Sequence, residues 1–360
     1  MTLSFCFILK KGYKNMFKSL KDASLIADEI LVADFSKDNI QNIMQSNTGL
    51  ADDALVYGFD PSIDYSFAID YLSKSASGDW ILLLFGDEDL SVPNPDEVKK
   101  ELENTDAEAF SVRIVHLLGR APHSPIRAFK TYSPRLFRKG QNFRFCGKIP
   151  EMLVCNISEN RPQVMKDITI KNHAFTFEGI EPSCADILSE NGSMFCCKAF
   201  ESFCAGEYDK ALSLLNQAEK NYKEKGEKPP AVLYKLRFET MLNMGEIAKV
   251  YKEIRNAIRL YSDYADLHFY KALSLFANNR FKEAAEGFSY CLLLGEGNKD
   301  YIISCGYGAC LALYFLGISY TKMGEEKHFE ELFNQASRVC PDPKALEAEA
   351  RKIPGIKLQQ

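Results

Sequence analysis

Three apolar runs near the start of the chain most constrain its fold. Leu3–Leu9 is apolar at every position but Ser4, and similar runs occupy residues 29–34 and 79–85. Successive side chains of a strand point to opposite faces of its sheet, so a strand that is apolar throughout must be buried on both faces. These runs therefore predict central strands of a sheet that is covered on both sides.

Two segments with helical spacing, 15–26 and 65–75, separate these strands. Apolar residues three and four positions apart share one face of a helix. The residues predicted to face the sheet are Met16, Phe17, Leu20, Leu25, Phe67, Ala68, Tyr71 and Leu72. A further, weaker strand is predicted at 55–57. Strands that alternate with helices over about ninety residues predict an α/β fold with a mostly parallel sheet and right-handed crossovers.

Acidic residues stand where the predicted strands end. Asp34 closes the second run, and Asp87, Glu88 and Asp89 follow the most apolar strand. Ligands of open α/β sheets bind at the carboxyl ends of the strands. Carboxylates at that edge suit a ribose or base hydroxyl, or a divalent cation that stands between them and a phosphate. The alternative for each acid is a polar turn or a helix cap.

After residue 108 the strand pattern becomes less regular. Short strands are predicted at 109–116, 143–145, 152–156 and 168–177. The basic residues of positions 113–138 are interpreted as a solvated loop face, and a cradle for a diphosphate is the alternative.

Charge and composition narrow the class of protein. The net charge of −5 gives no electrostatic reason to expect nucleic acid or an acidic membrane surface as a partner. No apolar stretch reaches the roughly 18 residues needed to span a bilayer. No basic region precedes the apolar start, so a signal peptide is not expected. The 11 cysteines include no C-x-x-C pair, which indicates buried, reduced thiols. The chain is therefore expected to be cytoplasmic.

From about residue 185 the apolar spacing is helical almost throughout. Gly206, Gly245, Gly324 and the pair Asn278-Asn279 interrupt it, and about eight helices in antiparallel pairs are predicted. The units start about 39, 34 and 45 residues apart, which brackets the period of about 34 residues that is typical of tetratricopeptide repeats.

Particular residues strengthen the likeness to these repeats. The positions that fit their pattern are Ala199, Ala211, Ala218, Phe238, Met241, Ala257, Ala272, Ala284, Phe288, Gly317, Tyr320, Phe333, Ala336 and Pro341. Residues 185–355 therefore resemble a tetratricopeptide domain. One helix pair cannot bury its own apolar face, so such pairs stack into a curved solenoid whose concave side binds a peptide or protein. The alternative is that the array braces the first domain or forms a dimer contact.

Four segments of the first half resemble the family-2 glycosyltransferases of the GT-A fold, in the bacterial branch with a tetratricopeptide tail. The most specific segments are YSFAIDYLSKSASGDWILLLFGDEDL at 65–90 and RLFRKGQNFRFCGKIPEML at 135–153. The other two occupy 3–38 and 168–177, in the order that the family has. The resemblance implies a GT-A domain over residues 1–180.

The resemblance also implies roles for particular residues. The family binds a nucleotide-diphosphate sugar at the strand ends and uses Mn²⁺ or Mg²⁺ to neutralise the leaving diphosphate. Asp87 matches the metal-binding acid of the family's D-x-D motif, and His173 matches a histidine that approaches the metal or the diphosphate. Glu151 matches a carboxylate that is the candidate base on the acceptor hydroxyl. The residues implied to contact the nucleotide sugar are Asp34, Asp38 and Glu88.

The family's pattern is missing at several points, and two functions follow. Phe85 replaces the first acid of D-x-D, Ile69 replaces an arginine that holds phosphate, and Pro150 replaces the histidine of I-H-E. Lys11 and Gly12 stand where Asn-Glu is usual. The first expectation is a metal-dependent glycosyltransferase whose repeats present a protein, peptide or glycan acceptor. The alternative is an adaptor whose transferase domain has lost its catalytic activity and which binds a partner protein through its repeats.

Overall fold

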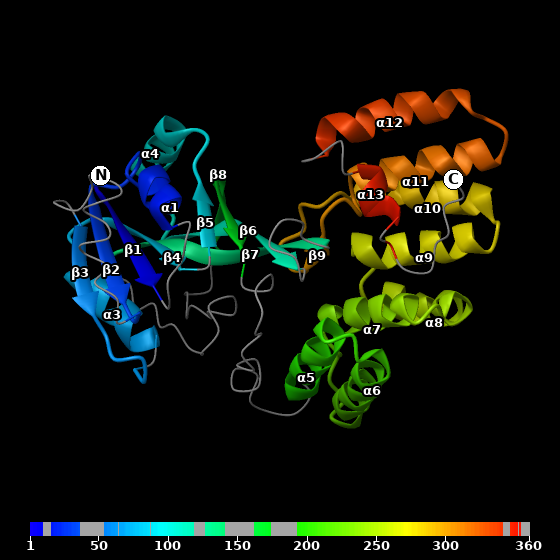
Figure 1. Cartoon of the computed structure of the whole chain (residues 1–360), viewed down its shortest axis with the longest axis horizontal. Coiled ribbons are helices and arrows are strands. Elements are labelled where there is room, and N and C mark those ends of the chain that lie inside the picture. The colour runs from blue at the N-terminus through cyan, green and yellow to red at the C-terminus, as the bar shows by residue number, and fades with distance from the viewer. Residues whose placement is uncertain are drawn as a thin grey trace. The chain divides into compact units, whose positions relative to one another are not determined.

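The computed structural model divides the chain into two compact units, which are described separately. One contains residues 1–125 and 131–187, and the other contains residues 126–130 and 188–360. Figure 1 shows the sheet of the first unit and the stacked helices of the second. The residues that the structure describes are 1–9, 16–36, 54–63, 65–86, 88–118, 127–140, 162–173, 193–340, 346–351 and 353.

The first unit is a mixed α/β unit built on one sheet. Its described strands are β1 (Leu3–Leu9), β2 (Glu29–Asp34), β3 (Ala54–Gly58), β4 (Trp80–Phe85), β5 (Glu88–Ser91), β6 (Ala109–Leu118), β7 (Arg127–Arg138) and β8 (Gln163–Asn172). They lie in the order β3-β2-β1-β4-β7-β6-β8-β5. Strands β1 to β4 are parallel to their neighbours within that group, whereas β7 runs antiparallel to β4. The predicted parallel sheet is therefore confirmed for the first four strands.

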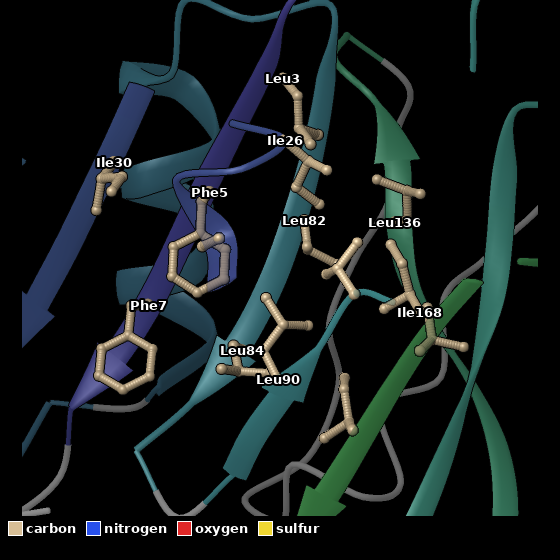
Figure 2. Packing of buried hydrophobic residues seen from close by; sticks show 14 of the residues in the cluster. Leu3, Phe5, Phe7, Ile26, Ile30, Leu82, Leu84, Leu90, Leu136 and Ile168 are labelled. Carbon is tan, nitrogen blue, oxygen red and sulfur yellow. The ribbon is translucent and has the colours of Figure 1, made fainter. Parts of the chain in front are cut away.

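Alternate residues of β1 enter two different cores. Phe5 and Phe7 belong to a core that also contains Leu20 of helix α1 (Met16–Ala23), and Figure 2 shows the packing of this core. Ile8 points to the opposite face, where it packs in a core with Leu72 of helix α3 (Tyr65–Ser75). All of β1 and β4 is buried, as the apolar runs predict. Each such large side chain contributes roughly 1.5–3 kcal/mol when it is fully buried.

The predicted apolar side of α3 is wrong in part. Phe67 and Tyr71 are 57% and 42% exposed, and the buried residues of the helix are Ala68, Ile69 and Leu72. The small and aliphatic side chains face the sheet, and the larger rings lie at the surface. Phe67 and Tyr71 instead contact Phe59 with ring centroids 6.4 and 5.7 Å apart.

Leu25 was also predicted to face the sheet, and this is wrong as well. Helix α1 ends at Ala23, and the side chain of Leu25 beyond it is 48% exposed. Since the helix stops before this position, the helical spacing no longer controls where the side chain points.

The interpretation of residues 113–138 as a loop face is also wrong where the structure describes them. Strands β6 and β7 occupy most of this stretch, and Arg135 is fully buried. Two further elements, β5 and helix α4 (Pro95–Glu103), were not predicted. The strands predicted at 143–145 and 152–156 lie outside the described residues.

The second unit is a series of helix pairs of the tetratricopeptide type. Its helices are α5 (Ser193–Cys204), α6 (Tyr208–Glu224), α7 (Ala231–Asn243), α8 (Ile247–Leu260), α9 (Ala265–Ala277), α10 (Phe281–Leu294), α11 (Cys310–Lys322), α12 (Lys327–Val339) and α13 (Leu346–Arg351). Each helix from α5 to α11 contacts the next one along the chain, and α13 contacts α11; Figure 1 shows the pairs. No described helix is long and apolar enough to cross a membrane.

The turns within the pairs share one backbone feature. Gly206, Gly245, Asn279 and Gly324 all have positive φ, at 78°, 77°, 57° and 85°. These residues lie between α5 and α6, α7 and α8, α9 and α10, and α11 and α12. Glycine and, less readily, asparagine adopt this left-handed conformation at the end of a helix. The repeat predicted from spacing is thus confirmed by the same turn in each of these four pairs.

Small residues set the closest approach within a pair. A Cβ atom on Gly287 of α10 would lie 2.8 Å from the Cβ of Ala272 on α9, which is closer than two carbon atoms can pack. Gly317 of α11 has the same relation to α12, since its added Cβ would meet Phe329 at 3.0 Å. The small residues of the repeat pattern therefore allow the helix backbones to come together.

Candidate functional site

Asp34 lies at the carboxyl end of β2, in the middle of the parallel strands. Its register partners are Leu9 on β1 and Gly58 on β3. The carboxylate Oδ1 accepts hydrogen bonds from the backbone N–H and the hydroxyl of Ser36, at 2.8 and 2.6 Å. This is a side-chain turn of the kind that aspartate forms after a strand. In the structure Asp34 therefore orders the turn, and its implied contact with a nucleotide remains a prediction.

Glu88 is buried in an ion pair that spans the sheet. Its Oε1 accepts a hydrogen bond of 2.8 Å from the guanidinium of Arg135 on β7, and both side chains have 0% exposure. Its Oε2 accepts a hydrogen bond of 3.0 Å from the backbone N–H of Phe85. The guanidinium carbon of Arg135 lies 4.7 Å from the centre of the Phe85 ring. The ion pair therefore joins β5 to β7, and the hydrogen bond from Phe85 joins β5 to the end of β4. Removing either charged partner would leave an uncompensated buried charge.

His173 contacts the next acid of the same strand. Its Nε2 lies 2.9 Å from Oδ2 of Asp89, and the two side chains are 21% and 13% exposed. His173 follows β8, which pairs antiparallel with β5. A histidine held by a carboxylate can bind a metal through its other ring nitrogen. Its role toward a metal or a diphosphate nevertheless remains a prediction.

The remaining residues implied by the glycosyltransferase resemblance are not described. Asp38, Asp87 and Glu151 lie outside the described residues, so their roles remain predictions. Within the described ranges, no three His, Cys, Asp or Glu side chains come together in a way that would hold a metal ion. The structure pairs Glu88 with Arg135 and Asp89 with His173. The sequence analysis did not predict either pair.

An open groove lies on the helical unit, along α10 and the end of α11. Its volume is about 690 Å³. Residues of α10 one or two turns apart form one wall, because positions separated by three, four or seven lie on the same helix face. The residues of the lining that bear on binding are Lys282, Glu286, Tyr290, Leu293, Tyr320 and Glu325.

The groove combines exposed apolar groups with acids. Leu293 is 79% exposed and Tyr290 is 41% exposed. The ring of Tyr290 packs edge-on against His268 of α9, with centroids 4.7 Å apart, so its orientation is restrained. Tyr320 stacks on His328 at 5.0 Å. Sequence reasoning missed this surface, although residues 282, 286, 290 and 293 follow helical spacing opposite the buried stripe of α10.

A buried polar group also lies inside the helical unit. Lys235 of α7 donates to Oδ2 of Asp266 on α9 at 2.5 Å, and it also donates to the hydroxyl of Ser304. The backbone N–H of Ser304 donates to the same carboxylate at 3.0 Å. Burial raises the pKa of Asp266, and the neighbouring Lys235 opposes that shift. Ser304 belongs to β9 (Ile303–Ser304), which pairs with residues 129 and 130 of β7. The group is enclosed and serves stability.

The helix pairs and their recurrent turns define a helical-repeat unit that resembles tetratricopeptide repeats. No protein-family model matches the chain. A TPR repeat-containing protein of Synechococcus elongatus is 28% identical to this chain over 144 residues, which are 40% of this chain and 33% of that protein. The chain thus spans about a third of the length of this curated relative.

Solved structures are also similar to part of the chain. MamA of strain AMB-1 has a TM-score of 0.33 at 14% identity, over 43% of this chain and 76% of its own. YrrB, described as a TPR protein with an unusual peptide-binding site, has a TM-score of 0.35 at 14% identity, over 45% of this chain and 74% of its own. These scores are too low to establish a shared fold. The assignment of the repeats therefore rests on the turns, the small-residue contacts and the sequence similarity.

Proposed function

We propose that this protein is an adaptor that binds a partner protein through its helical repeats. The observation that carries the proposal is the open groove on a unit of tetratricopeptide-type helix pairs, since an exposed apolar surface rimmed by charge is typical of a protein-binding site. Leu293 and Tyr290 supply the apolar surface, and Glu286, Glu325 and Lys282 supply the charges.

The test uses the full chain and a peptide library displayed on phage. We expect enrichment of a set of peptides that bind the chain with a Kd in the micromolar range or tighter when they are resynthesised and measured by calorimetry. A scrambled version of each peptide is the control. If no enriched peptide binds better than its scrambled version, the adaptor proposal fails.

A second candidate function, transfer of a sugar from a nucleotide-diphosphate donor, draws no support from the comparisons. The observation in its favour is the position of Asp34 at the carboxyl end of the parallel strands, which is where open α/β sheets bind ligands. The implied residues are Asp34, Asp38 and Glu88 toward the donor, Asp87 and His173 toward Mn²⁺ or Mg²⁺, and Glu151 as base.

Ligand-induced stabilisation tests this second candidate. A donor that binds the folded chain adds RT ln(1 + [L]/Kd) to its stability, about 2.7 kcal/mol at a hundredfold excess over Kd. A panel of nucleotide sugars, each with and without Mn²⁺, should then raise the melting temperature for at least one donor, and less so in Asp87→Ala. No shift across the panel would refute the transferase.

A further inference from the structure

We propose that the groove on α10 and α11 binds an extended segment of a partner protein in which a basic side chain and an apolar side chain stand three residues apart. The proposal rests on the adaptor function, and it specifies which part of the repeats makes the contact and what the partner carries. Its support comes from the exposed apolar residues, the charges and the spacing on α10.

The apolar half of the groove has no covering group in the described part of the chain. Leu293 has the largest exposed fraction among the described large hydrophobic residues, at 79%. Tyr290 stands one turn before it and is held edge-on against His268. An aliphatic or aromatic side chain of the partner would remove both groups from water, which is the main favourable term in association.

The acidic half of the groove lies one turn further toward the start of α10. Glu286 and Glu325 face one lysine, Lys282, among the charged residues of the lining. Neither Glu286 nor Lys282 forms an ion pair within the described ranges, whereas Glu283 of the same helix pairs with Arg280. Glu325 lies 3.5 Å from Nδ1 of His328. The excess of acid selects a lysine or arginine of the partner.

The spacing on α10 fixes the spacing in the partner. Glu286 and Leu293 are seven positions apart, and a helix rises about 1.5 Å per residue, so the two positions are separated by roughly 10 Å along one helix face. A segment in the polyproline II conformation advances about 3.1 Å per residue and has three residues per turn, so side chains three positions apart lie on the same side of it. Three residues of such an extended segment cover about the same distance, and the motif is basic-x-x-apolar.

The test measures fluorescence anisotropy of labelled synthetic peptides with the full chain. The first set carries lysine and leucine three residues apart with varied residues between them. A second set moves the leucine next to the lysine, and a third replaces the lysine by glutamate. We expect the first set to bind at least about tenfold more tightly than the other two, a difference equivalent to about 1.4 kcal/mol.

Variants then locate the site. Leu293→Asp and Glu286→Lys should each weaken binding of the first set about tenfold or more. The matched controls are Val339→Asp and Glu330→Lys on α12, because both side chains are exposed and lie outside the groove. The controls should change the affinity less than about twofold. Circular dichroism serves as the folding control: all four variants should keep the helical content of the parent chain.

Two results would overturn the proposal. The first is equal affinity for the three peptide sets. The second is binding of the first set that Leu293→Asp and Glu286→Lys leave unchanged. In either case peptides selected from the phage library can still bind elsewhere on the repeats, so the adaptor function would survive. Failure of that selection as well would remove both proposals.

Discussion

Acidification should weaken the first unit through His116, a buried histidine on β6. The side chain of His116 is 1% exposed, and its Nε2 lies 2.7 Å from the hydroxyl of Thr131. Burial, and then the neighbouring charge of Arg135, lowers the pKa of His116 to about 3. In the unfolded chain its pKa is about 6.5. Between these two values the unfolded state binds a proton that the folded state does not, so stability falls as the pH falls.

The size of the effect follows from the linkage relation. A group with a folded pKa of about 3 and an unfolded pKa of about 6.5 lowers the free energy of unfolding by about 2 kcal/mol between pH 7 and pH 5. Replacement by glutamine removes the titration while keeping a polar group of similar reach beside Thr131. The variant His116→Gln should therefore lose about 2 kcal/mol less than the parent chain over the same interval.

The chain contains a built-in probe for this measurement. Trp80 is its single tryptophan, and it lies fully buried in β4 of the first unit. Tryptophan fluorescence during urea unfolding thus reports on that unit and not on the helical repeats. If the parent chain and His116→Gln lose the same free energy between pH 7 and pH 5, burial of a neutral histidine is not the cause and the reasoning fails.

Three further predictions concern the helical unit. Asp266→Ala should lower its stability by about 3 kcal/mol, because it leaves the buried Lys235 without its nearest carboxylate; a loss below about 1 kcal/mol in urea unfolding followed by circular dichroism would contradict this. Gly245→Ala should cost about 1–2 kcal/mol by the same assay, since φ at this residue is 77° and an added Cβ meets strain but no clash. Burial raises the pKa of the Cys305 and Cys310 thiols to about 12, so iodoacetamide at pH 8 should modify them only after denaturation; mass spectrometry that finds them alkylated in the native chain would refute their protection.

Elements that depend on local pattern were predictable from the sequence. Strands β1 and β4 are apolar along their whole length, and only a strand that is buried on both faces suits such a run. The helix pairs were predictable because each turn needs a residue that tolerates positive φ, and glycine or asparagine marks it. In α3 the pattern located the helix but not its buried face, since rings and aliphatic residues compete for the sheet and only packing decides between them.

Features that depend on distant partners were not predictable. Glu88 and Arg135 are 47 positions apart, and neither residue alone indicates a buried pair. Charged residues are rarely buried without a partner. Because no partner for the basic residues of β7 could be identified from the sequence, they were interpreted as a solvated loop. The same limit applied to Lys235 and Asp266. Asp34 was located correctly at the end of β2, whereas Glu88 and Asp89 begin strand β5. The neighbours of these acids across the sheet had to come from the structure.

The contact between Gly287 and Ala272 has a consequence for recognition by the groove. Gly287 belongs to the same helix as Glu286 and Tyr290, and its lack of a side chain seats α10 directly on the backbone of α9. Because α10 is held rigidly in this way, it loses little conformational entropy when a ligand binds, so ordering the helix costs little binding free energy. Enlarging Gly287 would loosen that wall and weaken partner binding without altering any group that the partner touches.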